Sequence, residues 1–336
     1  MIKQSFLWLG ILFFLVAGCD DPGSATDIDT ESDADTDAYT GTGTDTYADA
    51  DTDTDTDTDT DTDTDTDADT DSYINTDTDS YINTDTDSDV IPSIGCGRTP
   101  SLLNSPSTAN QNNLMNRQFI IRWPDNYDNN HPYRLIISLH GAFGADTDIG
   151  PSYLGLFDLS NDSTIFVAPS AEGGFWNSSA DTAFVDEILT VVKADLCIDT
   201  TRIMLEGFSQ GAAMARVLGC TRPGVFRAIV AHSAGGLDMP SECEPIPYLG
   251  SLGLLDIMPN SQETQTDPFA KWNGCTIEHL PTAPDGGHVC TNYSNCPAAD
   301  PVRWCSFDSD HTPSPTDIGQ FTSWMPEEVW SFLTQF

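Results

Sequence analysis

The sequence predicts an α/β fold with a mostly parallel sheet, and three observations support this prediction. From Gly95 onward, apolar runs of strand length alternate with segments whose apolar residues recur at helical spacing. The apolar runs are nearly continuous, which is typical of strands that helices cover on both faces. One run leads into Gly207-Phe208-Ser209-Gln210-Gly211, where a helical pattern begins. Strands that alternate with helices imply parallel pairing through helical crossovers.

The elements of this fold can be placed along the sequence. We expect buried strands at apolar runs that cover residues 134–140, 164–168, 202–205, 227–232, 246–250 and 302–307. Helical spacing predicts helices over residues 183–196 and 210–219, and a closing helix over 326–334 with Pro326 in its first turn. Strands and helices alternate throughout residues 95–336, which we interpret as one domain.

The charge of the chain is concentrated in one segment. The 336 residues carry a net charge of −41, but residues 20–90 hold 26 of the 53 acidic residues and no Lys or Arg. Residues 91–336 keep 27 acidic and 11 of the 12 basic residues, a net charge of −16. Phosphate binding needs a patch of Lys and Arg, and none is visible, so we expect no nucleic-acid partner. About 240 residues remain for folding, enough for one α/β core.

The N-terminus has the pattern of an export signal. Lys3 precedes an apolar segment over residues 6–16, and Val16-Ala17-Gly18-Cys19 looks like a bacterial lipobox. We interpret residues 1–18 as a lipoprotein signal peptide and Cys19 as the lipid acceptor that holds the exported protein at the cell envelope or cell surface. The apolar segment is shorter than the roughly 20 residues that a membrane-spanning helix needs. An ordinary secreted protein is the main alternative.

Residues 19–94 are interpreted as the lipidated Cys followed by a disordered linker. Asp and Thr alternate from Asp51 to Asp67, and an eight-residue unit occurs twice, at 71–78 and 79–86. Such a tract has few apolar residues to offset the entropy of ordering, and its like charges repel one another. Calcium binding by the Asp side chains is the alternative, but the Gly of an EF-hand loop is missing.

Eight cysteines besides Cys19 fit an exported protein. An even number in an exported chain indicates disulfides, although the sequence does not give their pairing. A zinc site is the alternative, and the absence of any Cys-x-x-Cys pair argues against it. The eight are Cys96, Cys197, Cys220, Cys243, Cys275, Cys290, Cys296 and Cys305.

The strand–Gly-x-Ser-x-Gly–helix context at Ser209 is that of a nucleophile elbow. The two glycines let strand and helix approach closely around a strained turn, and the turn presents the serine hydroxyl to a base. We therefore predict Ser209 as a nucleophile on an α/β-hydrolase fold. The alternative is a glycine-rich packing turn with an idle serine.

The loop after His140-Gly141 is the expected source of an oxyanion hole. In this fold one N–H comes from that loop and the other from the residue after the nucleophile. We predict the N–H groups of Ala142 and Gln210, with Phe143 as the next choice for the first. His140 precedes the nucleophile in the chain, so we interpret it as structural.

The base and the acid should follow Ser209, with the acid first. His311 lies on a loop after a late strand, so we predict it as the base; His288 is its rival, and His232 at a strand end is interpreted as packed. Asp256 follows an expected strand between nucleophile and base, so we predict it as the acid. Its rivals are Asp238, Asp308 and Asp310.

With these motifs in place, the region from residue 95 to residue 336 resembles the exported feruloyl esterase and polyhydroxybutyrate depolymerase family of α/β-hydrolases. The resemblance rests on residues 95–97, 139–141, 166–169, 183–186, 194–199 and 207–211, and on Trp304-Cys305 before His311. It implies a triad of Ser209, Asp256 and His311. Two segments depart from the family: Ser251 to Asp256 lacks the usual His-Gly-x-x-Asp, and His311 follows Ser-Asp instead of Gly-Gly.

The resemblance implies a serine carboxylesterase that needs no cofactor and no metal. Its expected substrates are esters on polymers or small esters, and we favour a feruloyl or related carbohydrate esterase on plant cell-wall polysaccharide. Phe143, Phe175 and Trp176 could stack on a phenolic acid or a sugar, or could be ordinary loop packing. One alternative is a polyhydroxyalkanoate depolymerase, and another is a catalytically inactive binding protein on a hydrolase fold. The sequence carries no signal for an oligomeric state.

Overall fold

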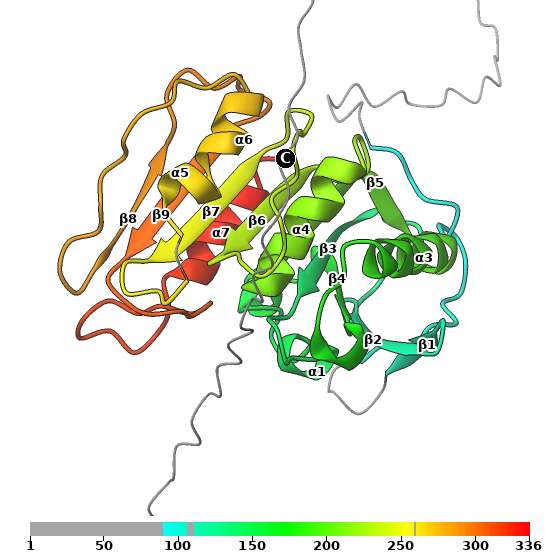
Figure 1. Cartoon of the computed structure of the whole chain (residues 1–336). Coiled ribbons are helices and arrows are strands. Elements are labelled where there is room, and N and C mark those ends of the chain that lie inside the picture. Colours follow the sequence, from blue (N-terminus) through cyan, green and yellow to red (C-terminus); the bar gives the residue numbers. More distant parts are fainter. Residues whose placement is uncertain (1–89, 106–110, 259) are drawn as a thin grey trace, which may run out of the picture. The chain divides into compact units, whose positions relative to one another are not determined.

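A computed structural model describes residues 90–105, 111–258 and 260–336 of the chain. The expected signal peptide, Cys19 and nearly all of the expected linker lie outside these residues. Within the described part, nine strands form one sheet in the order β1-β2-β4-β3-β5-β6-β7-β9-β8 (Figure 1). The six parallel strands are β4 (Thr164–Pro169), β3 (Tyr133–Leu139), β5 (Ile198–Phe208), β6 (Ala228–His232), β7 (Tyr248–Gly253) and β9 (Val302–Phe307).

Antiparallel strands extend both edges of the sheet, and the sequence analysis missed them. They are β1 (Asn112–Leu114), β2 (Arg117–Arg122) and β8 (His288–Asn292). β5 is also longer than expected, because it begins at Ile198 and includes the polar stretch from Asp199 that apolar patterning does not detect. The six parallel strands confirm the prediction of a mostly parallel sheet.

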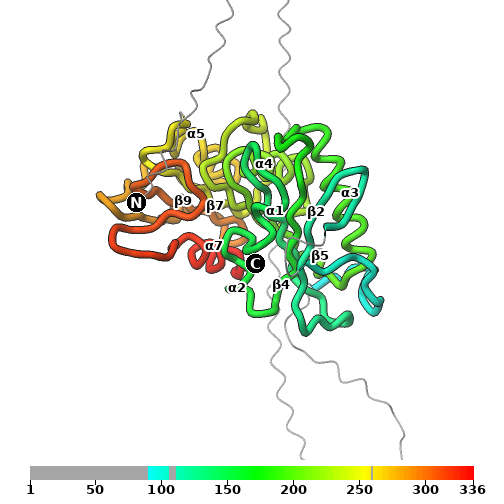
Figure 2. The backbone as a smooth tube through the Cα atoms, turned by 90° about the horizontal axis from the view of Figure 1, so that it is seen from below, coloured from blue at the N-terminus to red at the C-terminus, as the bar shows by residue number. Residues whose placement is uncertain are grey.

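Helices cover both faces of the sheet, and successive residues along each strand point to opposite faces and pack against different helices. Leu135 and Ile137 of β3 pack in one core cluster, whereas Ile136 packs in the other. The first cluster lies under α3 (Ala180–Asp195), α4 (Gln210–Thr221) and α6 (Asp267–Trp272). The second lies under α1 (Asp146–Ile149), α2 (Leu156–Leu159) and α7 (Met325–Leu333). Figure 2 shows α4 and α7 on opposite sides of β7.

The order of the strands creates a switch point between β3 and β5. The chain goes from β3 outward to β4 and then returns to β5 on the other side of β3. Crevices outside the carboxyl ends of strands at such a point are the usual ligand sites of open α/β sheets. The loop after β3 and the turn after β5 therefore emerge side by side, in the α/β-hydrolase arrangement that the sequence predicts.

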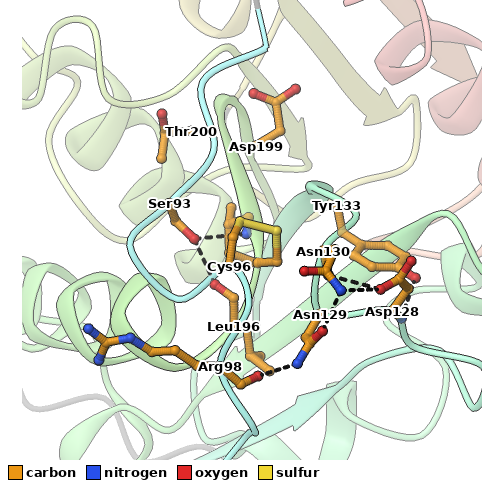
Figure 3. The surroundings of a disulfide bond; sticks show 12 residues. Ser93, Cys96, Arg98, Asp128, Asn129, Asn130, Tyr133, Leu196, Asp199 and Thr200 are labelled. Atoms are coloured by element: carbon orange, nitrogen blue, oxygen red, sulfur yellow. Dashed lines mark hydrogen bonds between the residues drawn. A yellow bond between two sulfur atoms is a disulfide. The ribbon is translucent and has the colours of Figure 1, made fainter. Parts of the chain in front are cut away.

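Four disulfides confirm the expectation from the cysteine count: Cys96–Cys197, Cys220–Cys243, Cys275–Cys296 and Cys290–Cys305. Figure 3 shows the first of them joining the N-terminal segment to the start of β5, beside Ser93. Ser93 adds two bonds there, since its hydroxyl donates to the carbonyl of Leu196 and accepts the N–H of Ile198. Disulfides persist in oxidising compartments, so this pattern is that of an exported protein.

The described helices give no sign of a membrane span. None of those between residues 90 and 336 combines the length and the apolar content that crossing a bilayer requires.

Candidate active site

Ser209 lies at the turn between β5 and α4 in a strained backbone conformation. Its φ of +56° is in the region that side chains other than glycine rarely adopt. The flanking glycines permit this turn, because a Cβ on Gly207 would overlap the backbone of Gly211, and one on Gly211 would overlap the carbonyls that end β3. The Ser209 N–H donates to the His232 carbonyl at 2.9 Å, and its carbonyl accepts the Gly235 N–H at 3.2 Å. The elbow is thus held from neighbouring β6.

The structure brings the three predicted triad residues into one hydrogen-bonded series. His311 Nε2 lies 2.8 Å from Ser209 Oγ, and His311 Nδ1 lies 2.8 Å from Asp256 Oδ2. The carboxylate accepts from Nδ1–H, which leaves Nε2 free to accept the serine proton. The Asp256 side chain is 1% exposed and that of His311 is 22% exposed. This arrangement can remove the Ser209 proton while a buried carboxylate stabilises the imidazolium.

The other candidates for the base and the acid form different contacts. His288 forms a hydrogen bond with Asp317 at 2.8 Å, and its ring stacks on Trp324 with centroids 3.7 Å apart. Asp308 accepts the Gly286 N–H at 2.6 Å. His232 is buried, with its ring bonded to other side chains. These contacts distinguish His288, His232 and Asp308 from His311 and Asp256, which are bonded to each other and to Ser209.

Two backbone N–H groups near Ser209 are available for an oxyanion. Among the described residues, the N–H groups of Ala142 and Gln210 have no hydrogen-bond partner. The N–H of Phe143, the second choice from the sequence, donates to the Gly174 carbonyl at 2.8 Å and is therefore occupied. The sequence analysis missed the roles of Gly174 and Gly235, because both act through backbone atoms that no side-chain pattern marks.

His140 shapes the loop that carries Ala142. Its Nδ1–H donates to the Gly141 carbonyl at 2.7 Å, and its Nε2 accepts the Ala171 N–H at 3.0 Å. Burial lowers the pKa of His140, so the ring stays neutral with both nitrogens in use. A Cβ on Gly141 would lie 3.4 Å from Ser209 Cβ, which places this loop directly against Ser209.

An exposed aromatic pair is formed by Phe143 on the same loop and by Phe175 on the connection between β4 and α3. Phe143 is 85% exposed and Phe175 is 44% exposed, and their ring centroids are 4.5 Å apart at nearly right angles. Phe143 also has a φ of +64°, an unfavourable backbone conformation for a bulky residue. Trp176 is different: it is buried, and its Nε1–H donates to the His140 carbonyl. Trp176 therefore packs the loop, while the two phenylalanines face solvent beside the site.

A groove of about 690 Å³ begins next to the elbow. It is lined by Gly236, which follows the residue that binds the Ser209 carbonyl, and by Ser178, Ser179, Leu237, Asp238 and Met239 among others. The groove lies on the side of Gln210, whose side chain packs against Gly236.

One group of side chains in the described part could suggest a metal site. Cys290, Cys305 and Glu328 lie close together, but the two cysteines form a disulfide and Glu328 pairs with Arg303. No thiolate is left there to coordinate an ion.

Comparisons with known proteins find relatives among the feruloyl esterases. No protein-family model matches the chain. "Probable feruloyl esterase C" of Aspergillus clavatus is 34% identical over 256 residues, covering 72% of this chain and 90% of the relative. "Feruloyl esterase D" of Neurospora crassa is 33% identical over 266 residues, covering 73% and 91%. Among solved structures, "Acetyl xylan esterase from Aspergillus awamori" covers 66% of this chain and 95% of that chain, with 14% identity and a TM-score of 0.48.

Proposed function

We propose that this chain, which belongs to the feruloyl esterase family of carboxylic ester hydrolases, cleaves feruloyl and related hydroxycinnamoyl esters of plant cell-wall polysaccharide. The observation that carries the proposal is the hydrogen-bonded series from Ser209 Oγ through His311 to Asp256. The N–H groups of Ala142 and Gln210 beside it, which are unpaired within the described residues, supply what an acyl-transfer site needs in addition to the nucleophile.

In the proposed reaction, Ser209 Oγ bonds to the ester carbonyl carbon while His311 Nε2 takes its proton. The carbonyl oxygen becomes an oxyanion and accepts from the N–H groups of Ala142 and Gln210. His311 then gives its proton to the leaving alcohol as the ester bond breaks, which leaves an acyl-enzyme. Water adds to the acyl carbon with His311 again as base, and the acid is released as Ser209 regains its proton.

Two surfaces support this choice of substrate. The exposed pair of Phe143, on the loop beside Ser209, and Phe175 offers ring faces and edges against which a planar phenolic ring can pack. The groove beside Gln210 has hydroxyl, carboxylate and apolar lining, which suits the sugar part of the ester.

We also propose that Cys19 carries a lipid anchor and that the acidic segment before the domain acts as a spacer. The lipobox-like Val16-Ala17-Gly18-Cys19 and the low-complexity sequence after it support this proposal. An anchored enzyme can act on a polymer that is too large to enter the cell.

A comparison of initial rates tests the function. The substrates are methyl ferulate, p-nitrophenyl acetate and short hydroxybutyrate oligomers, with the Ser209→Ala variant as the blank. We expect methyl ferulate to have the highest kcat/KM, and Ser209→Ala to remove the activity. Cleavage of the oligomers alone would instead identify a polyester depolymerase. A lack of Ser209-dependent turnover on all three would favour a binding protein on a hydrolase fold.

A further inference from the structure

Four polar side chains cross the sheet in one buried layer beneath the elbow. Ser138, Glu206, His232 and Ser251 lie on the neighbouring strands β3, β5, β6 and β7, and none is more than 2% exposed. We name these four residues the transverse network. The proposed reaction uses none of them.

Side-chain hydrogen bonds join the transverse network from end to end. The Ser138 hydroxyl donates to Glu206 Oε2 at 3.2 Å. The other carboxylate oxygen lies 3.3 Å from His232 Nε2, and His232 Nδ1 lies 3.0 Å from the Ser251 hydroxyl. Glu206 and His232 thus each have two partners, so every ring nitrogen and carboxylate oxygen in the network is paired.

This layer interrupts an otherwise apolar face. On each strand the residue two positions earlier points the same way, and these four, Ile136, Met204, Val230 and Leu249, belong to the core cluster under α7. Burying polar groups and a carboxylate costs free energy even when they are hydrogen-bonded to each other. Apolar residues would fill the layer at lower cost, which points to a role beyond filling the core.

Each strand in the network leads to a part of the candidate active site. The strand of Ser138 ends at the loop of Ala142, and the strand of Glu206 ends at Ser209. The strand of Ser251 leads to Asp256. His232 completes the set, because its carbonyl accepts the N–H of Ser209 itself.

We propose that Glu206 and His232 are positioning residues for the esterase reaction. Through the transverse network they fix the spacing of the strand ends that carry the oxyanion loop, the nucleophile and the acid. This inference rests on the proposed function, in which Ser209 is the nucleophile.

The geometry of the elbow explains why such a constraint matters. Ser209 has a φ of +56°. Within the described part of the chain, its hydrogen bonds beyond its own helix turn go to His311 and to backbone atoms of residues 232 and 235. A displacement of about 1 Å between reacting groups can cost about 10²-fold in rate. Side-chain bonds across four strands oppose such a displacement directly. Burial raises the pKa of Glu206, and the hydrogen bond with His232 opposes this shift.

The test compares kcat per active site in variants of the full chain. End-point titration with a fluorophosphonate counts the active sites. The substrate is p-nitrophenyl acetate. We expect Glu206→Leu to lower kcat per site by about tenfold or more with KM within about twofold. Glu206→Gln should recover part of this loss, because its amide oxygen can still accept from His232 Nε2–H. Ser251→Ala, which removes one hydroxyl and keeps the hydrogen bond between Glu206 and His232, should lower kcat by about threefold.

Ser233→Ala is the matched control, because Ser233 is also buried next to His232 but its hydroxyl has no partner among the described residues. Its kcat should equal that of the unaltered chain. If the network has a merely structural role, Glu206→Gln and Ser251→Ala will lower the melting temperature and the number of active sites but leave kcat per site unchanged. That result would overturn this inference and leave the proposed function standing. Absence of Ser209-dependent turnover in the unaltered chain would overturn the proposed function and this inference with it.

Discussion

Two sets of a serine, a histidine and an acidic residue lie at the carboxyl edge of the sheet, one open and one closed. Ser209, His311 and Asp256 form the open set, and Ser251, His232 and Glu206 form the closed one. The side chain of His311 is 22% exposed, whereas that of His232 is 1% exposed. Both sets link a serine hydroxyl, an imidazole and a carboxylate by hydrogen bonds.

The difference lies in what surrounds each serine. Ser209 lies on a strained turn beside two N–H groups that have no partner in the described part of the chain, so a carbonyl group can reach it and be stabilised there. Ser251 lies within β7 and is buried, so no substrate can reach it. Residue types and hydrogen bonds alone do not define a catalytic set; access and oxyanion donors decide the chemistry. The following predictions test this comparison.

Removing the base should have the largest effect. We expect His311→Ala to lower kcat on methyl ferulate by about 10⁴-fold or more, because Ser209 then has no proton acceptor. His288→Ala is the control, since His288 is similarly exposed and also paired with an aspartate. Its kcat should stay within about fivefold of the unaltered chain, apart from any loss of stability from the Trp324 stack. Equal losses in the two variants would contradict the assignment of the base.

Altering the acid should have a somewhat smaller effect. Asp256→Asn keeps the size of the side chain but no longer favours the Nδ1–H tautomer or stabilises the imidazolium. We expect kcat to fall by about 10³-fold to 10⁴-fold with KM little changed. Steady-state kinetics on methyl ferulate measure both. Unchanged kcat would show that another carboxylate orients His311.

Truncating the exposed aromatic pair should change substrate preference. In Phe143→Ala we expect kcat/KM for methyl ferulate to fall by about fivefold to tenfold, because a ring contact is lost. The kcat/KM for ethyl acetate, which has no ring, should stay within about twofold of that of the unaltered chain. Leu254→Ala removes an exposed apolar side chain from the loop before Asp256 and serves as the control. Parallel losses on both esters would assign Phe143 to loop structure.

The closed set should also affect the free energy of unfolding, and this is the smallest of the effects that we expect. Burial raises the pKa of Glu206 above its ordinary value of 4.5, so the folded protein binds this proton more tightly than the unfolded chain. The associated stability is fully present below the ordinary pKa and is lost as the pH rises through the folded-state value. Glu206→Gln does not titrate. The unfolding free energy of the unaltered chain minus that of the variant should therefore fall as the pH rises above the ordinary pKa of 4.5 and through the raised folded-state pKa of Glu206. Urea unfolding measures this difference, and a rise would contradict it.

The sequence predicted the parts of the fold that follow from apolar patterning. The six parallel strands and the helices α3, α4 and α7 correspond to segments with a clear periodicity. β1, β2 and β8 escaped prediction because they are short or mixed in polarity and are held by pairing at the sheet edges. The eight cysteines indicated disulfides, but only the folded backbone shows which ones meet.

The candidate site also divides into residues that the sequence predicted and contacts that only the folded structure shows. Ser209 was recognisable because its motif requires a fixed local geometry, and chain order narrowed the search for Asp256 and His311. Their catalytic roles stay predictions, while their hydrogen bonds are structural facts. Phe143 was a reasonable oxyanion candidate until its N–H was seen to donate to Gly174. Glu206 gave one signal that was overlooked: a charged residue near the end of an apolar strand, just before the elbow.

The most direct test of the central claim is the site and stoichiometry of covalent labelling by a fluorophosphonate, which reacts with activated serines. The full chain is labelled, digested and mapped by mass spectrometry, and methyl ferulate hydrolysis is followed in parallel. We predict one label per chain, on Ser209, with hydrolysis lost in proportion to labelling. Labelling of a different serine, or full hydrolysis after complete labelling of Ser209, would contradict the account.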